Sequence, residues 1–309
     1  MKKLILGFLL LLTISGCSNS NADQTTADEN QQAITNYDRT IQIKGVPESV
    51  ITMGPNTTEL FCELGLADKV IGNTLNNHSR GPLPEYKKDY EKIPELTHGS
   101  ATREAVLSSG ADFIYGIDWE FGSEGLSIDE LAENGLTVYQ NKAKTIDEVY
   151  QEITDIGRIF EVEAQAEKFI EEQKDRLEAV ADTAPKEPVK VLVYDSGDSG
   201  IFTASGSNYE SRLIEAAGGI NLFDDQTEKD WTTVSSEEVL ERQPEVILVH
   251  DYDQPALADK IAAIKADPAL SQLEAVKNNR IVSMSLENAL PGPRLAETVE
   301  QLAEGFQKK

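Results

Sequence analysis

The sequence predicts an α/β fold of two doubly wound lobes joined by a single long rigid helix, with a ligand cleft between the lobes. Its 309 residues are enough for two lobes that each have a core. Strand and helix patterns alternate on both sides of residues 163–181, as in parallel α/β sheets. A helix–turn–strand pattern also occurs once in each half: Glu104-Ala-Val-Leu107 with Ala111-Asp-Phe-Ile114 matches Glu237-Glu-Val-Leu240 with Pro244-Glu-Val-Ile247 at one offset.

The joining helix is predicted over Glu163 to Ala181 and, with its flanks, over residues 161–185. Mostly apolar residues recur there every three or four positions, so one narrow stripe is expected to be buried. The stripe consists of Val162, Ala166, Phe169, Ile170, Gln173, Leu177 and Val180. Pro185 and Pro188 end the helix, because proline cannot continue helical hydrogen bonding.

The N-terminus has the pattern of an export signal over residues 1–16. Lys2 and Lys3 precede the apolar run Leu4 to Leu12, which is too short to span a membrane. Ile14-Ser-Gly-Cys17 follows and resembles the lipobox of bacterial lipoproteins, which implies a lipid on the Cys17 sulfur. The alternative is a plain secretory signal with a chance cysteine. The lipobox predicts an exported protein, anchored on the outer face of the bacterial cytoplasmic membrane.

Composition sets the domain boundaries and excludes several partners. Residues 17–37 are polar and predict a flexible linker, followed by an N-terminal lobe over 38–160 and a C-terminal lobe over 186–309. The formal net charge of −26 argues against nucleic acid and anionic lipid surfaces as partners. Cys17 and Cys62 are the only cysteines, so a lipid on Cys17 leaves Cys62, predicted to be a buried thiol, without a partner.

The remaining elements follow from period-2 and period-3.6 patterns bounded by Gly and Pro. In the first half, after an apolar segment from Ile41, strands are predicted at 50–53, 70–72, 113–115 and 137–139, and helices at 57–64, 103–108, 128–133 and 146–160. In the second half, strands are predicted at 189–194, 246–249 and 281–284, and helices at 209–217, 236–242, 260–266 and 294–306.

Ligands of open α/β sheets bind at the carboxyl ends of the strands, so the loops that leave the strands are where we expect a site. The candidate ligand-binding residues are Asn56, Asn76, His78, His98 and Trp119 in the first half, and Phe202, Trp231, His250, Tyr252 and Arg294 in the second. The aromatic residues among them can stack on a large organic ligand, although aromatic residues near strand ends are also common in cores.

All three histidines of the chain, His78, His98 and His250, fall in these loops. Imidazoles from two lobes can close on a metal ion or on an axial position of an iron complex. The alternative is that they are ordinary polar loop residues, since no His-x-His or His-Glu-x-x-His spacing accompanies them.

One motif raises an enzymatic alternative. Gly197-Asp-Ser-Gly200 looks like the nucleophile sequence of trypsin-like proteases, with His250 as a base available to Ser199. The predicted α/β pattern does not match the all-β fold of those proteases. The other interpretation of this motif is a Gly-rich loop that faces the cleft. A Ser199-dependent hydrolase remains the alternative from another functional class.

Several ordered blocks resemble the substrate-binding proteins of ABC importers for iron-siderophore, haem and cobalamin. The blocks are Val46 to Leu60, the two Glu-x-Val-Leu units, Ile214 to Asn221, Trp231 with Val234-Ser235, and Ala275 to Ile281. The resemblance covers Ile41 to Phe306, and Thr145 to Lys168 is similar to a branch labelled as metal-binding.

This resemblance implies a monomeric receptor that binds an iron complex or a corrinoid without turnover and delivers it to a membrane permease with a cytoplasmic ATPase. It implies that Glu104 and Glu237 pair with arginines of the permease, that no residue is catalytic, and that no cofactor is attached other than the lipid on Cys17. Ala111-Asp112 departs from the Pro-Asp of many members, and Arg80 and Arg294 are the only arginines in the cleft loops. The scarcity of arginine disfavours a catecholate complex. The alternative within this class is a receptor for a bare transition metal held by the histidines and carboxylates.

Overall fold

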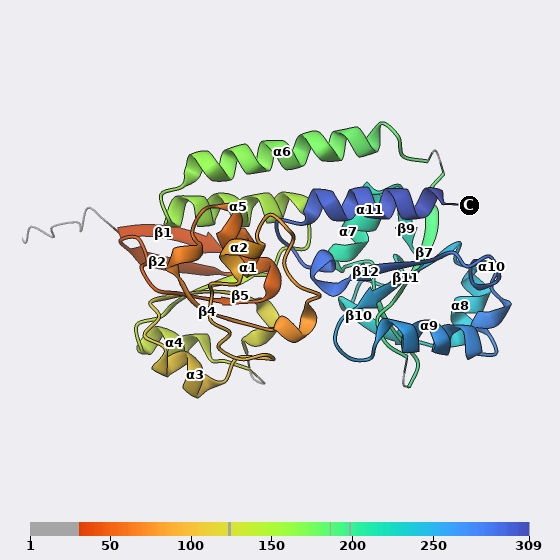
Figure 1. The fold of residues 1–309 in the computed structure, drawn as a ribbon, viewed down its shortest axis with the longest axis horizontal. Coiled ribbons are helices and arrows are strands. Elements are labelled where there is room, and N and C mark those ends of the chain that lie inside the picture. The colour runs from red at the N-terminus through yellow and green to blue at the C-terminus, as the bar shows by residue number, and fades with distance from the viewer. Residues whose placement is uncertain (1–30, 123–124, 186, 198, 309) are drawn as a thin grey trace, which may run out of the picture.

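The computed structural model describes residues 31–122, 125–185, 187–197 and 199–308, and in them two lobes are each built on a four-stranded parallel sheet (Figure 1). The N-terminal sheet has the order β4-β3-β5-β6, and its strands are β3 (Val50–Met53), β4 (Val70–Thr74), β5 (Phe113–Ile117) and β6 (Thr137–Asn141). The C-terminal sheet has the order β12-β11-β7-β9, and its strands are β7 (Val189–Tyr194), β9 (Gly219–Asn221), β11 (Val246–Asp251) and β12 (Ile281–Ser285).

Helices cover both faces of each sheet, which confirms the doubly wound fold (Figure 1). The N-terminal lobe has α1 (Pro55–Glu63), α2 (Lys87–Tyr90), α3 (Arg103–Ser108), α4 (Ile128–Glu133) and α5 (Ile146–Ile159). The C-terminal lobe has α7 (Tyr209–Ala216), α8 (Ser236–Arg242), α9 (Leu257–Ala266), α10 (Glu274–Lys277) and α11 (Leu295–Gln307). Side chains of Thr102, Ser127, Thr145 and Ser235 cap α3, α4, α5 and α8, which explains why these helices begin where the sequence predicts.

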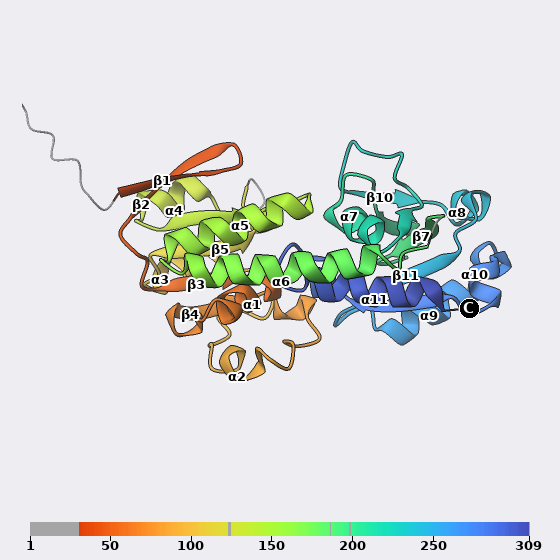
Figure 2. The same cartoon turned by 90° about the horizontal axis from the view of Figure 1, so that it is seen from above.

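Helix α6 (Glu163–Ala181) has the predicted bounds and runs along both lobes (Figures 1 and 2). Ala166, Phe169, Gln173 and Val180 are its buried residues, all members of the predicted stripe. The contact with α5 is close, because a Cβ added to Gly157 would lie 2.7 Å from the Cβ of Ala166. On the other lobe, the Gln173 side-chain oxygen accepts a hydrogen bond of 2.9 Å from the Ala296 amide of α11.

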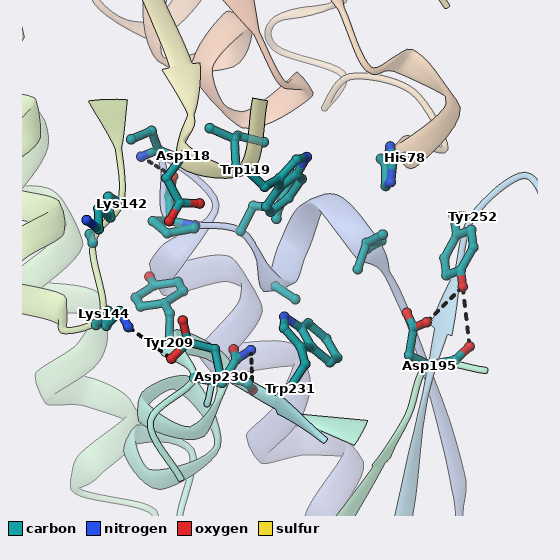
Figure 3. A pocket seen from close by; sticks show the side chains of 18 of the residues that line it. His78, Asp118, Trp119, Lys142, Lys144, Asp195, Tyr209, Asp230, Trp231 and Tyr252 are labelled. Atoms are coloured by element: carbon teal, nitrogen blue, oxygen red, sulfur yellow. Dashed lines mark hydrogen bonds and ion pairs between the residues drawn. The ribbon is translucent and has the colours of Figure 1, made fainter. Parts of the chain in front are cut away.

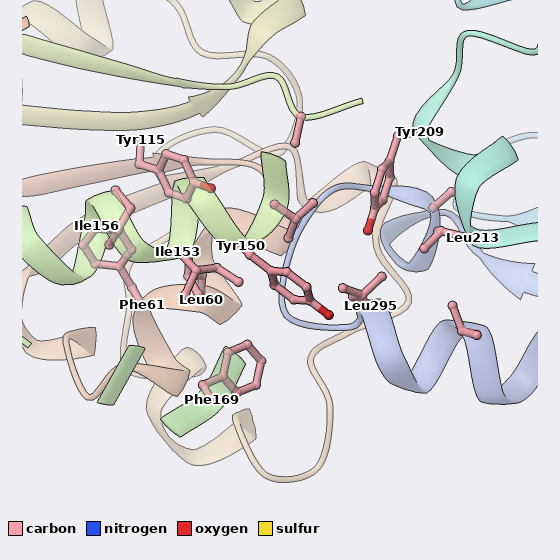
Figure 4. Packing of buried hydrophobic residues seen from close by; sticks show 14 of the residues in the cluster. Leu60, Phe61, Tyr115, Tyr150, Ile153, Ile156, Phe169, Tyr209, Leu213 and Leu295 are labelled. Carbon is pink, nitrogen blue, oxygen red and sulfur yellow. The ribbon is translucent and has the colours of Figure 1, made fainter. Parts of the chain in front are cut away.

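The largest apolar cluster is continuous between the lobes, which differs from the two separate cores expected. Figure 4 shows Tyr150 of α5 near Leu295 of α11, and the same cluster includes Phe61, Phe169 and Leu213. Two further clusters lie within single lobes. The connection between the lobes is therefore a packed interface as well as a helix.

The prediction of a flexible linker over residues 17–37 is wrong for the C-terminal end of this range. Strand β1 (Gln31–Asn36) pairs with β2 (Arg39–Lys44) in an antiparallel hairpin. Ile34 is buried, and Asn36 exchanges two hydrogen bonds with the Gln140 backbone of β6. The polar composition concealed this strand, because its burial depends on pairing rather than on an apolar run. Residues 1–16, Cys17 and the start of the linker lie outside the described residues.

The C-terminal lobe also contains an antiparallel ribbon that was not predicted from the sequence. Strand β8 (Ile201–Ala204) pairs with β10 (Trp231–Val234). Within the part of the chain that the structure describes, no helix is long and apolar enough to cross a membrane.

Candidate functional site

A pocket of about 420 Å³ lies between the two lobes, where strands of both sheets end (Figure 3). Segments following β4, β5 and β6 contribute one side, including His78, Asp118, Trp119, Lys142 and Lys144. The other side comes from segments following β7 and β11, from the β8/β10 ribbon and from the start of α7, and includes Asp195, Phe202, Tyr209, Asp230, Trp231 and Tyr252. The expected position of a site, at the carboxyl ends of strands from both lobes, agrees with this pocket.

Two tryptophans from opposite lobes frame the middle of the pocket (Figure 3). Trp119 follows β5 and is 49 % exposed. Trp231 opens β10 and stacks on Phe202 of β8, with ring centroids 5.1 Å apart and an interplanar angle of 15°. Exposed aromatic faces of this kind bind flat or bulky organic groups.

One end of the pocket carries most of its charge. The Lys144 ammonium of the N-terminal lobe lies 3.0 Å from the Asp230 carboxylate of the C-terminal lobe and so bridges the cleft. Lys142 and Asp118 lie beside this pair (Figure 3). Burial raises the pKa of the Asp118 carboxyl, and the positive charge of Lys142 opposes that effect.

The other end presents hydrogen-bonding groups. The Tyr252 hydroxyl donates to Asp195 Oδ2 at 3.0 Å. His78 Nδ1 lies 2.9 Å from Asn77 Oδ1, and because an amide oxygen only accepts, Nδ1 carries the proton. Burial lowers the pKa of His78, so the ring is neutral at pH 7 and Nε2 is its acceptor atom.

The sequence matches the periplasmic binding proteins over residues 50–286. The chain belongs to this family. It is 28 % identical to an uncharacterised ABC transporter substrate-binding lipoprotein of Bacillus subtilis, YvrC, over 96 % of this chain and 94 % of that protein. It is 26 % identical to the vitamin B12-binding protein of Vibrio cholerae, over 82 % of this chain and 87 % of that protein.

Solved structures support the same fold. A periplasmic binding protein from Veillonella parvula superposes with a TM-score of 0.79 at 24 % identity, over 90 % of this chain and 97 % of that one. A protein of an ABC-type Fe³⁺-hydroxamate transport system from Saccharomonospora viridis superposes with a TM-score of 0.75 at 23 % identity, over 90 % of this chain and 99 % of that one. These comparisons confirm the recognised family and the two-lobed α/β fold.

In this periplasmic binding protein, half of the ten predicted ligand residues line the pocket: His78, Trp119, Phe202, Trp231 and Tyr252. The other five lie elsewhere. Arg294 is 4 % exposed and forms ion pairs with Glu59 and Glu287 at the junction of the lobes. Asn56 is also buried there, and its amide donates to the Pro291 carbonyl at 2.7 Å.

Asn76 and His98 belong to the rim of the cleft rather than to the pocket. The Asn76 amide donates to Glu95 at 2.7 Å. His98 is exposed and lies between Glu95 of its own lobe and Asp253 of the other lobe, at 3.2 and 3.0 Å. In this structure His98 therefore contacts the other lobe and does not line the pocket.

The predicted three-histidine metal site is not formed. His250 is fully buried on β11, and both of its ring nitrogens bond to carboxylates, Asp195 and Glu210. His78 lines the pocket, whereas His98 is on the rim. Among the described residues, no group of three or more His, Cys, Asp or Glu side chains is placed to hold a metal ion.

The base expected for Ser199 is engaged elsewhere. Ser199 is exposed, and His250, the expected base, has both nitrogens engaged in buried hydrogen bonds. The members of this family are solute-binding proteins.

Tyr209, Lys142 and Lys144 also line the pocket and were not predicted from the sequence. The lysines follow β6, so the strand-end argument that identified Trp119 could have found them. Tyr209 opens α7 and lies between the lobes (Figure 4). It was assigned only to a helix, and no local pattern indicates which helix start faces the other lobe.

Glu104 and Glu237 occupy equivalent positions in the two lobes. Each is exposed, and each is the second residue of a capped helix, α3 or α8. Both helices lie on the side of the molecule away from α6 (Figure 1). The internal repeat therefore corresponds to equivalent elements of the two lobes.

Proposed function

We propose that this protein is the receptor of an ABC importer and binds an organic metal complex, an iron chelate or a corrinoid, in the pocket between its lobes. The observation that carries the proposal is the pair Trp119 and Trp231, which frame the pocket from opposite lobes (Figure 3). A ligand held between them contacts both lobes at once, and so stabilises their closed arrangement. The vitamin B12-binding relative and the Fe³⁺-hydroxamate neighbour support this class of cargo.

The charges of the pocket favour a neutral or cationic complex. Its lining includes the carboxylates of Asp118, Asp195 and Asp230 but only two ammonium groups, Lys142 and Lys144, and Lys144 is paired with Asp230. Among the residues that the structure describes, no arginine lines it, and Arg294 forms ion pairs with Glu59 and Glu287. Since arginine is the side chain best suited to carboxylates and catecholates, ferric hydroxamates and corrinoids fit better than haem or ferric catecholates.

Delivery would use the surface that carries Glu104 and Glu237. Two exposed carboxylates on separate lobes can pair with arginines of a permease and register the distance between the lobes. A lipid on Cys17 would keep the receptor on the outer face of the membrane, beside the permease and its ATPase. We propose that the protein acts as a monomer without catalysis.

The test is a titration of the purified protein, followed by tryptophan fluorescence, with cyanocobalamin, ferrichrome, ferrioxamine B, haemin, and Ni²⁺, Zn²⁺ and Fe³⁺ salts. Saturable quenching by a corrinoid or a ferric hydroxamate is the expected result. Metal-free hydroxamate and heat-denatured protein are the controls for nonspecific quenching. Binding restricted to free metal ions, or to haemin alone, would contradict the proposed cargo.

A further inference from the structure

His250 lies directly behind the pocket wall, between two carboxylates. Its Nδ1 is 3.0 Å from Asp195 Oδ1, and its Nε2 is 2.9 Å from Glu210 Oε1. The side chains of His250 and Glu210 are 0 % exposed, and that of Asp195 is 13 % exposed. Because ionised carboxylate oxygens only accept hydrogen bonds, both ring nitrogens must donate, and this requires the imidazolium form.

A second buried cation, Lys260, lies beside His250. Lys260 is 3 % exposed, and its ammonium donates to the His250 carbonyl at 2.9 Å while lying 3.4 Å from the Tyr252 ring centroid. Burial alone would lower the pKa of His250, but the charge of Glu210 and the bonds to both carboxylates raise that pKa to about 9. Burial lowers the pKa of Lys260 to about 8. The charges of Asp195 and Asp251 oppose this effect of burial, so the two buried cations lie among the carboxylates of Asp195, Glu210 and Asp251.

This buried group connects to the pocket through Asp195. Both oxygens of its carboxylate are held, Oδ1 by His250 and Oδ2 by the Tyr252 hydroxyl at 3.0 Å. Burial would raise the pKa of the Asp195 carboxyl, but the hydrogen bond and charge of His250 outweigh burial and keep that pKa below its usual value. Each carboxylate oxygen has a second lone pair, so Asp195 can still accept from a ligand. Asp195 and Tyr252 face the pocket at one end (Figure 3).

We propose that His250 is a positioning residue that sets the charge selectivity of cargo binding. Held between Asp195 and Glu210, it fixes the Asp195 carboxylate and the Tyr252 ring at one end of the pocket. That end then accepts an N–H, O–H or cationic group of the cargo and repels a carboxylate. This inference rests on the proposed function. It adds the chemical class of the cargo group that contacts the C-terminal lobe at this end of the pocket.

The protonation of His250 can be measured without any ligand. In ¹⁵N-histidine NMR spectra of the whole protein, one imidazole should remain doubly protonated from pH 5.5 to 8, while His78 and His98 give separate signals. His250→Gln should remove this one signal. A neutral His250 at pH 7 would overturn the inference and leave the proposed function untouched.

Charge selectivity is tested with a matched series of ligands. Ferrioxamine B carries one ammonium group, its N-acetyl derivative is neutral, and its N-succinyl derivative carries a carboxylate on the same chelate. The wild-type protein should bind the ammonium form about tenfold more tightly than the carboxylate form. If cyanocobalamin is the better ligand, its monocarboxylic acid replaces the succinyl compound. Failure of every parent ligand to bind would overturn the proposed function, and with it this cargo assignment.

Two variants separate positioning from simple packing. Asp195→Asn should reduce the preference to less than about threefold, since the repelling charge is gone. In His250→Gln the Asp195 carboxyl loses its cation, so its pKa should rise and the preference should fall more steeply than in the wild-type protein as the pH is lowered from 7 to 5.5. Lys265→Gln, an exposed change on the same helix as Lys260, is the control. An unchanged preference in Asp195→Asn, or a pH-independent one in a folded His250→Gln, would overturn the inference.

Discussion

Arg294 and Glu59 form a buried ion pair across the boundary between the lobes. The Arg294 guanidinium donates two hydrogen bonds, of 2.7 and 2.6 Å, to the Glu59 carboxylate, and the two side chains are 4 % and 0 % exposed. Glu287, also 0 % exposed, lies 3.2 Å from the same guanidinium. This ion pair therefore joins the start of α11 to α1 of the other lobe, close to the point where α6 connects the two lobes.

Removing this cation should be costly. Arg294→Met leaves Glu59 and Glu287 buried without their partner, and we expect a loss of about 3–5 kcal/mol in the free energy of unfolding. Arg176→Met is the matched control, because Arg176 makes the same two-bond contact with Glu300 but both side chains are about two-fifths exposed. That variant should lose less than about 1 kcal/mol. Urea unfolding measures the free energy of unfolding of both variants. Equal losses in the two variants would contradict the role assigned to burial of the Arg294 ion pairs.

Gly157→Ala should destabilise the protein, although helix propensity alone predicts the opposite. Alanine is favoured over glycine by about 1 kcal/mol within a helix. At this position, however, the new methyl group would lie 2.7 Å from the Ala166 Cβ and push α5 away from α6. We expect a net loss of about 1–3 kcal/mol in the free energy of unfolding. A stabilised variant would show that α6 does not pack on α5 as described.

The bounds of the long helices and of several strands were predictable because apolar spacing and caps are local signals. Val50–Met53, Glu163–Ala181 and Val189–Tyr194 agree residue for residue with their predictions. The β8/β10 ribbon was not predicted, since its strands are separated in the sequence by α7 and β9. Strand β1 was not predicted, because its composition is polar and its buried Asn36 contacts the distant Gln140 of β6.

The candidate site was predictable to the extent that strand ends locate it. Trp119 and Tyr252 follow strands and line the pocket. Arg294, Asn56 and His250 also lie near strand ends, but they face the other lobe or the core. Sequence position shows that a residue is near the cleft, and only packing determines which side of the backbone its side chain takes.

The contact between His98 and Asp253 predicts a pH-dependent opening of the lobes. Hydrogen bonds to Asp253 and Glu95 raise the pKa of His98, so its support for the closed arrangement is complete below the ordinary histidine pKa of about 6.5. That support is lost as the pH rises through the raised value. Small-angle scattering of the ligand-free protein should therefore show a larger radius of gyration at pH 8.5 than at pH 5.5.

Two variants serve as controls for this pH effect. His98→Gln removes the titrating ring, and Asp253→Asn removes its partner in the other lobe. Both should make the radius of gyration independent of pH over this range. If the radius of gyration of the wild-type protein does not change with pH, the contact between His98 and Asp253 does not influence the distance between the lobes.

Charge reversal at Glu104 and Glu237 should separate delivery from binding. In vesicles that contain the cognate permease and ATPase, Glu104→Arg with Glu237→Arg should lower cargo uptake at least about tenfold, because like charges would face each other. Cargo affinity should not change, since neither residue lines the pocket. Glu178→Arg, an exposed position on α6, should leave uptake unaffected. A loss of affinity in the double variant would assign these residues a different role.

The most direct measurement uses the fact that the chain has only two tryptophans, one on each side of the pocket. Trp231→Phe leaves Trp119 as the sole reporter on the N-terminal lobe, and Trp119→Phe leaves Trp231 on the C-terminal lobe. Each variant is titrated with the cargo that the wild-type protein binds. If the cargo lies between the lobes, both reporters are quenched, each with the dissociation constant that calorimetry gives for that variant. Quenching of only one reporter at saturation would contradict a ligand held between the lobes.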